Sequence, residues 1–256
     1  MRRIIPLVFA FFVLLSGTAQ AEKITVAAAA DLKFAMDEIV VAFKKANPAD
    51  GVEIIYGSSG KFHTQIKQGA PYDLFFSADI AFPRELAKAG FAASPVVPYA
   101  VGRIVLWSSS VDATKLTLDS LADPKFTRIA IANPKHAPYG KRAEEALRAS
   151  GLWGKLESRL VYGENIAHTA QFVQTGNAEV GILALSLALS PELANKGAYY
   201  LIPDSLHQPL EQGFIITKRA EGNAMARRFA DFMSSPSTRT IMTRYGFVLP
   251  SESLGK

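Results

Sequence analysis

Short apolar runs alternate along the chain with longer segments in which apolar residues recur every three or four positions. Residues 24–28 form an apolar run typical of a buried strand. Residues 32–46 carry Leu, Ala, Met, Ile, Val and Phe at helical spacing, opposite lysines and acidic residues. Because this strand-then-helix order recurs, the pattern predicts an α/β protein with mainly parallel sheets flanked by helices.

The first group of predicted elements occupies the N-terminal 90 residues. After the helix over 32–46, we expect strands over 52–56 and 73–76 and a helix over 61–68. Asp79 is predicted to cap a further helix that Gly90 ends.

A second group follows a strand predicted over 101–107, which has no helix directly after it. The pattern predicts strands over 128–132, 159–162 and 180–185 and helices over 141–150 and 167–175. A last strand over 213–217 and helices over 222–233 and 237–245 are expected to rejoin the first group.

This order predicts two lobes joined by two chain crossings. Lobe I comprises residues 22–102 and 213–256, and lobe II comprises residues 103–212. We expect the ligand cleft between the lobes, where strand ends and helix starts meet.

Residues 1–21 have the features of a signal peptide. Arg2 and Arg3 precede an apolar run over 4–15, and Ala19-Gln20-Ala21 provides a small-x-small cleavage signature. A membrane anchor is the alternative, but the apolar run is shorter than the roughly 20 residues of a spanning helix. We therefore predict cleavage after Ala21 and location in the periplasm, which suits a chain that contains no cysteine.

The charge of the chain indicates no nucleic-acid partner. Removal of residues 1–21, which hold two arginines and no acidic residue, lowers the formal net charge from +5 to +3. The remaining lysines and arginines are scattered singly or in pairs, as on a solvated surface.

The candidate chemistry lies where predicted strands give way to helices. Gly57-Ser58-Ser59-Gly60 is one such junction, Asp31 lies at a second and Pro138-Tyr139-Gly140 at a third. Free N–H groups and the positive end of the helix dipole make such junctions suited to anions. Several of them around one point would bind an oxyanion without a charged partner.

The chain resembles the periplasmic molybdate-binding proteins of ABC importers, the ModA family, over essentially all of its mature length. The markers, in order, are the segments VAAAADL over 26–32, GSSG over 57–60, GAPYDLFFSAD over 69–79, NP at 133–134 with APYG over 137–140, and RYGF over 244–247. The resemblance implies a type II, two-lobed binding protein that closes on molybdate or tungstate and presents it to a membrane permease. It also implies a monomer without a cofactor.

The same resemblance implies a set of residues that bind the oxyanion: Ala30, Asp31, Ser58, Ser59, Tyr139 and Ile166. Ser59 would donate through its hydroxyl and its N–H group, and Ile166 through its N–H group alone. A plain helix start is the alternative for Ser59, and packing within the lobe is the alternative for the Ile166 side chain.

Two of these positions depart from many members of the family. Asp31 replaces a serine, and because an ionised carboxylate would repel a dianion, we expect its side chain to turn away as a helix cap while its N–H donates. A cap without any ligand role is the alternative. Tyr139 replaces an alanine, while Ala184 stands where those members have tyrosine, so one phenolic donor is exchanged for another across the cleft. A wall residue is the alternative for Tyr139.

The expected pocket contains donors only. Without an acceptor it would reject protonated oxyanions such as hydrogen phosphate, and it would reject sulfate by size. Tungstate, which is almost the size of molybdate, should bind.

The sequence offers three other interpretations of the function: an enzyme, a ferric-binding protein and an adhesion or signalling module. The four histidines are dispersed and neither Gly-x-Ser-x-Gly nor His-Glu-x-x-His occurs, which argues against an enzyme. Tyr199-Tyr200 is similar to the tyrosine pair of ferric-binding proteins, but a strand over 197–203 would point the two side chains in opposite directions. An adhesion or signalling module would need an interaction tail or coiled coil, and the sequence contains neither.

Overall fold

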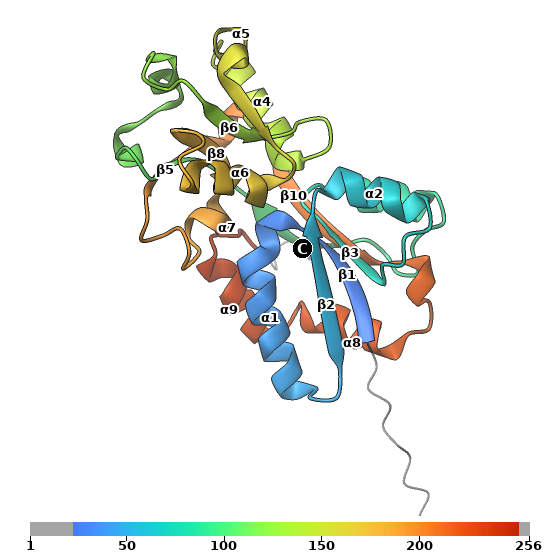
Figure 1. Ribbon diagram of the computed structural model, residues 1–256. Helices are drawn as coiled ribbons and strands as arrows, with labels where there is room; N and C mark the ends of the chain where they lie inside the picture. The colour runs from blue at the N-terminus through green and yellow to red at the C-terminus, as the bar shows by residue number, and fades with distance from the viewer. Residues whose placement is uncertain (1–22, 251–256) are drawn as a thin grey trace, which may run out of the picture.

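The computed structural model describes residues 23–250 as two α/β lobes, each built on one five-stranded sheet (Figure 1). The predicted signal peptide and its cleavage site after Ala21 lie outside the described residues. Within residues 23–250, every helix is too short or too polar to cross a bilayer.

The sheet of the first lobe has the strand order β2-β1-β3-β10-β4. Its strands are β1 (Lys23–Ala29), β2 (Gly51–Gly57), β3 (Leu74–Ser77), β4 (Val97–Gly102) and β10 (Leu210–Ile216). Its helices are α1 (Lys33–Ala46), α2 (Ser59–Lys67), α3 (Ala81–Lys88), α8 (Ala224–Phe232) and α9 (Pro236–Arg244). β1 runs parallel to β2 and β3, whereas β10 is antiparallel to β3 and β4.

Both faces of this sheet are covered, and the alternation of side chains along β1 shows how. Ile24 and Val26 pack in one apolar cluster with residues of α1 and α8, whereas Ala27 packs on the other face with Phe62 of α2 and Leu86 of α3. Because successive side chains of a strand point to opposite faces, β1 is apolar nearly throughout.

The sheet of the second lobe has the order β7-β6-β8-β5-β9. Its strands are β5 (Ile104–Ser108), β6 (Ile129–Ala132), β7 (Leu160–Gly163), β8 (Val180–Ala184) and β9 (Ala198–Leu201). Its helices are α4 (Pro138–Ala149), α5 (Trp153–Leu156), α6 (Ile166–Gln174) and α7 (Leu185–Ala188). β6 is parallel to β7 and β8, and β5 is antiparallel to β8 and β9. Since a single strand is reversed in each described sheet, both are mainly parallel, as predicted.

Short 3₁₀ helices connect several of these elements: η1 (Ala30–Leu32), η2 (Ala113–Lys115), η3 (Leu118–Ala122), η4 (Glu157–Arg159), η5 (Asp204–Leu206) and η6 (Lys218–Ala220).

The prediction of one strand over 101–107 is wrong. β4 ends at Gly102 in the first sheet, β5 begins at Ile104 in the second, and Arg103 alone separates them. Buried residues lie on both sides of Arg103, at Gly102 and over 104–107, and only their different partners, β10 for β4 and β8 and β9 for β5, divide the two strands.

The chain returns to the first lobe earlier than predicted. β10 pairs with β4 from Leu210 onward, so residues 210–212 lie in the first sheet rather than in lobe II. The polar pair Glu211 and Gln212 interrupts the apolar pattern, and the register shifts between Gln212 and Gly213. The other boundaries of the lobes stay a prediction.

Several helices begin before the predicted residue. α2 begins at Ser59 instead of residue 61, and α4 begins at Pro138 instead of residue 141, because proline suits the first position of a helix. The cap position of α3 is Ile80 rather than Asp79, although the Asp79 carboxylate accepts a hydrogen bond from the Ala81 N–H group at 2.9 Å. The earlier starts bring Ser59 and Tyr139 into first helical turns.

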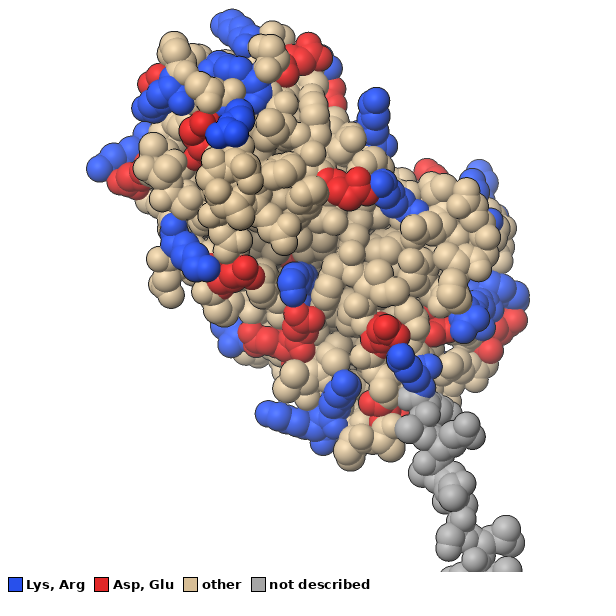
Figure 2. Space-filling model, viewed as in Figure 1, with Lys and Arg blue, Asp and Glu red and all other residues tan. Residues whose placement is uncertain are grey.

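Charges of both signs are mixed on the face of the molecule that Figure 2 shows. Ion pairs at the surface include Lys23–Glu53 and Arg148–Glu144.

Candidate functional site

A small pocket lies between the lobes. Its lining is drawn from both lobes and comprises Ala29, Ala30, Asp31, Gly57, Ser58, Ser59, Ala78, Ala137, Pro138, Tyr139, Asn165 and Ile166. All six residues expected to bind an oxyanion are in this set. The structure thus brings them together, while their roles toward a ligand stay a prediction.

The N-termini of three helices open on this pocket. Ser59 is the first residue of α2, Pro138 and Tyr139 are the first two of α4, and Ile166 is the first of α6. The N–H groups of a first helical turn have no partner within the helix and lie at the positive end of its dipole. None of the described lining residues is lysine or arginine, so the positive potential here comes from neutral groups.

Ser59 presents a hydroxyl to the pocket from a buried position. Its Oγ accepts a hydrogen bond of 3.0 Å from the N–H group of Ala78, at the end of β3. Because this bond uses a lone pair of the oxygen, the O–H of Ser59 is available to donate to a ligand.

Ser58 connects the two lobes. Its hydroxyl donates a short hydrogen bond to the carbonyl oxygen of His136, which also accepts the N–H group of Gly60 at 3.0 Å. Nδ1 of His136 lies 3.0 Å from the same Ser58 oxygen. Since the single hydroxyl proton goes to the carbonyl, Nδ1 is the donor in this contact.

The imidazole of His136 is neutral at pH 7. Burial lowers its pKa, and the negative charge of Glu164, which acts to raise the pKa, is the smaller effect.

Asp31 lines the pocket and is buried in a polar network. Its Oδ2 accepts hydrogen bonds from the Tyr139 hydroxyl at 2.9 Å and from Nε2 of Gln212 at 2.8 Å. Nε2 of Gln212 also donates to the Tyr139 oxygen at 3.1 Å, and the Ser186 hydroxyl donates to the carbonyl oxygen of Asp31 at 2.8 Å. Burial raises the pKa of Asp31 to about 6, although the hydrogen bonds from Gln212 and Tyr139 act in the opposite direction.

The expectation that Asp31 caps a helix is wrong. Asp31 lies inside η1, whose cap residue is Ala29, and no side chain caps that helix. The carboxylate instead finds its donors in Tyr139 of the second lobe and Gln212 of β10. The difference arises from tertiary packing. A fully buried carboxylate needs hydrogen-bond donors, and here the donors that pack against it belong to residues far away in the sequence.

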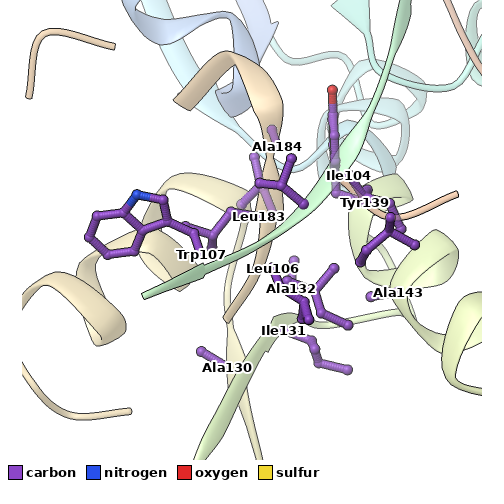
Figure 3. Close-up of a cluster of buried hydrophobic side chains, with 14 of the residues drawn as sticks. Ile104, Leu106, Trp107, Ala130, Ile131, Ala132, Tyr139, Ala143, Leu183 and Ala184 are labelled. Carbon is purple, nitrogen blue, oxygen red and sulfur yellow. The ribbon is translucent and has the colours of Figure 1, made fainter. Parts of the chain in front are cut away.

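Tyr139 has both an apolar and a polar environment. Its ring belongs to the buried cluster of the second lobe, and its hydroxyl points away from the aliphatic side chains of that cluster (Figure 3). Burial and the negative charge of Asp31 raise its pKa well above the usual value, so the phenol remains a donor at neutral pH. Its hydrogen bond to Asp31 is a role that sequence reasoning missed.

Three further residues of the site were not among those expected to bind the anion. Gln212 is buried at an irregular point of β10, and no local signal distinguishes it from a surface glutamine. His136 contributes its main-chain carbonyl, which sequence does not reveal. Asn165 is the N-cap of α6, and its side-chain oxygen accepts a hydrogen bond of 3.0 Å from the His168 N–H group. An asparagine directly before a predicted helix is a typical N-cap, and this pattern could have identified Asn165 from the sequence.

The features that favoured other readings lie away from the pocket. Tyr199 is 38% exposed, whereas Tyr200 packs against the core of the second lobe, so the two phenols do not converge. In the part of the chain that the structure describes, no group of three or more His, Cys, Asp or Glu residues could hold a metal ion.

Two α/β lobes with helix N-termini converging on a pocket between them define a two-lobed, type II solute-binding protein. The chain belongs to the family of bacterial extracellular solute-binding proteins, whose model matches residues 24–248. This membership agrees with the prediction of a binding protein rather than an enzyme.

Relatives within this class confirm the resemblance found in the sequence. The molybdate-binding protein ModA of Azotobacter vinelandii is 36% identical over 240 residues, which cover 92% of this chain and 94% of that protein. ModA of Rhodobacter capsulatus is 35% identical, with 90% of each chain covered.

Solved structures confirm the fold. The periplasmic molybdate-binding protein of Azotobacter vinelandii matches with a TM-score of 0.84 and 32% identity, covering 89% of this chain and 100% of that one. The sulfate-binding protein SubI of Mycobacterium tuberculosis matches with a TM-score of 0.72 at 16% identity, over 91% of this chain and 88% of that one, and it shares the fold.

Proposed function

We propose that this protein binds molybdate in the pocket between its lobes and delivers it to the membrane permease of an ABC importer. The observation that carries this proposal is the convergence of the N-termini of α2, α4 and α6 on a pocket whose described lining has no lysine or arginine. The names of the ModA relatives supply the identity of the anion.

The residues proposed to contact the anion act as neutral donors. Ser59 donates through its hydroxyl and its N–H group, while Ala30, Tyr139 and Ile166, which line the pocket, donate through their N–H groups. A hydrogen bond to a charged group contributes about 1.5–3 kcal/mol, so several of them offset the desolvation of a dianion. Tungstate has the same shape and charge and is proposed to bind as well.

The proposed function also implies a location and an oligomeric state for the protein. It is exported, cleaved after Ala21 and located in the periplasm, where it acts as a monomer. A single pocket that both lobes enclose is complete within one chain, which supports the monomer.

Calorimetric titration of the mature protein tests the function directly. Molybdate and tungstate should each bind with a one-to-one stoichiometry, whereas sulfate, phosphate and ferric citrate should produce little or no heat. Absence of heat with both metal oxyanions would refute the proposal. A visible phenolate-to-iron band with ferric citrate would then favour the iron reading, and product formation in a turnover assay would favour the enzyme reading.

A further inference from the structure

A carboxylate in the wall of a pocket for a dianion is the least expected feature of this molecule. Asp31 lines the pocket and is 1% exposed. Its Oδ2 has two donors, but its Oδ1 has no hydrogen-bond partner among residues 23–250. A buried, unpaired carboxylate oxygen beside an anion site is costly unless the ligand or a proton changes its state.

The side chain is held in place from several elements. The Tyr139 hydroxyl on α4 and the Gln212 amide on β10 donate to Oδ2, and Ser186 on α7 donates to the Asp31 carbonyl oxygen. The buried phenol of Tyr99 on β4 has its pKa raised by burial and by the negative charge of Asp31. These surrounding groups are neutral, so they do not compensate the charge of the carboxylate.

Basic groups on the elements around Asp31, including Arg103, which pairs with Asp204, bond elsewhere. Lys33, at the start of α1, pairs with Asp37. Arg142, on α4, pairs with Asp79 and Glu145, and His136 is neutral and bonded to Ser58.

We propose that the pocket takes up its oxyanion together with one proton, which is shared between the anion and the Oδ1 atom of Asp31. The inference rests on the proposed function, since it concerns the anion that the pocket binds. The proton comes from solvent, so a carboxylate, a proton and a dianion give a complex with a net charge of −2 in place of −3.

The hydrogen bonds balance in this complex. A proton on Oδ1 makes a donor that has no acceptor in the described protein, and the anion supplies that acceptor. If the anion instead carries the proton, its O–H donates to Oδ1. The two arrangements contain the same atoms and have the same net charge, and they differ only in the position of the proton along one hydrogen bond. Burial has already raised the pKa of this carboxyl group to about 6, and the two negative charges of the anion raise it further in the complex, so that the proton is held above neutral pH.

Asp31 therefore determines which anions fit. The pocket contains an acceptor, contrary to the donors-only expectation, and its affinity for molybdate falls as protons become scarce. Linkage predicts that the Kd rises about tenfold per pH unit above the pKa of free Asp31, and levels off below that value.

The first measurement uses the unaltered mature protein and needs no variant. Molybdate is titrated calorimetrically at pH 7.5 in two buffers with different ionisation enthalpies, such as Hepes and Tris. The difference in observed heat gives the number of protons taken up, which should be about one per anion. A value near zero would overturn the inference while leaving molybdate binding intact.

The second measurement compares variants over pH 6.5 to 8.5. Asp31→Asn keeps the shape of the side chain without its charge, so its Kd should stay within about threefold over this range, and its proton uptake should vanish. Asp37→Asn, on the neighbouring helix and outside the pocket lining, should keep the slope and the proton uptake of the unaltered protein.

The outcomes separate the two proposals. A pH slope that persists in Asp31→Asn would assign the proton to another group and refute the role of Asp31. Failure of molybdate and tungstate to bind either the unaltered protein or Asp31→Asn, with both folded by circular dichroism, would refute the proposed function itself.

Discussion

The N–H group of Gly60 on α2 donates a hydrogen bond of 3.0 Å to the carbonyl oxygen of His136, across the junction between the lobes. A Cβ atom at position 60 would lie 2.6 Å from that oxygen. Main-chain groups of the two lobes therefore approach so closely beside the pocket that only glycine fits between them.

Substitution of Gly60 by alanine should weaken anion binding by about tenfold or more, because the extra methyl group forces the two main chains apart. Titration calorimetry with molybdate measures the loss. Gly154→Ala is the matched control, since no atom lies within 4 Å of the added methyl group. An unchanged Kd in Gly60→Ala would show that this contact is irrelevant to binding.

Substitution of Ser59 by alanine should affect both stability and affinity. The buried N–H group of Ala78 loses its acceptor, which costs about 1–3 kcal/mol in the free energy of unfolding. The lost donor to the anion should raise the Kd by roughly tenfold to a hundredfold. Urea unfolding and calorimetry give the two values, and the exposed Ser205→Ala should change neither. Full affinity in Ser59→Ala would contradict its role as a ligand.

Asp31 should make the ligand-free protein less stable as the pH rises. Its pKa is about 6 in the folded state and near 3.8 when unfolded, so the cost of ionising it is absent below pH 3.8 and complete above pH 6. At about 1.4 kcal/mol per unit, the full cost is about 3 kcal/mol. Asp31→Asn should therefore stabilise the protein by about 2 kcal/mol more at pH 8 than at pH 4.5. Equal differences at both pH values in urea unfolding would contradict the raised pKa.

The ion pair between Lys61 on α2 and Glu164 before α6 joins the lobes at the surface. Both side chains are about half exposed, so Glu164→Gln should change the free energy of unfolding by less than about 1 kcal/mol. Anion release should nevertheless become about two to three times faster at low salt, and this difference should disappear at high salt. Stopped-flow release measures the rate. Glu53→Gln, which removes an exposed pair with Lys23 outside the pocket lining, should leave it unchanged.

The sequence predicted the parts of the site that depend on local order. A strand followed by a polar residue, glycine or proline and then a helix determines where helix N-termini lie, and this local pattern placed Asp31, Ser59 and Tyr139 near one point. The family resemblance added Ile166. The tertiary partners of Asp31 were not predictable, because Gln212 and Ser186 lie 181 and 155 residues away along the chain. The division of residues 101–107 between two sheets was equally hidden, because the residues directly on both sides of Arg103 are buried and only their tertiary partners differ.

The passage from β4 to β5 through Arg103 has a mechanical consequence. Gly102, the last residue before it, has no side chain, and a Cβ there would lie 2.3 Å from the Tyr139 hydroxyl and 2.6 Å from Nε2 of Gln212. One of the two chain crossings between the lobes thus passes directly beside the two groups that hold Asp31. A change in the position or protonation of Asp31 would therefore reach the main chain of this crossing through a single intervening side chain, that of Tyr139 or Gln212.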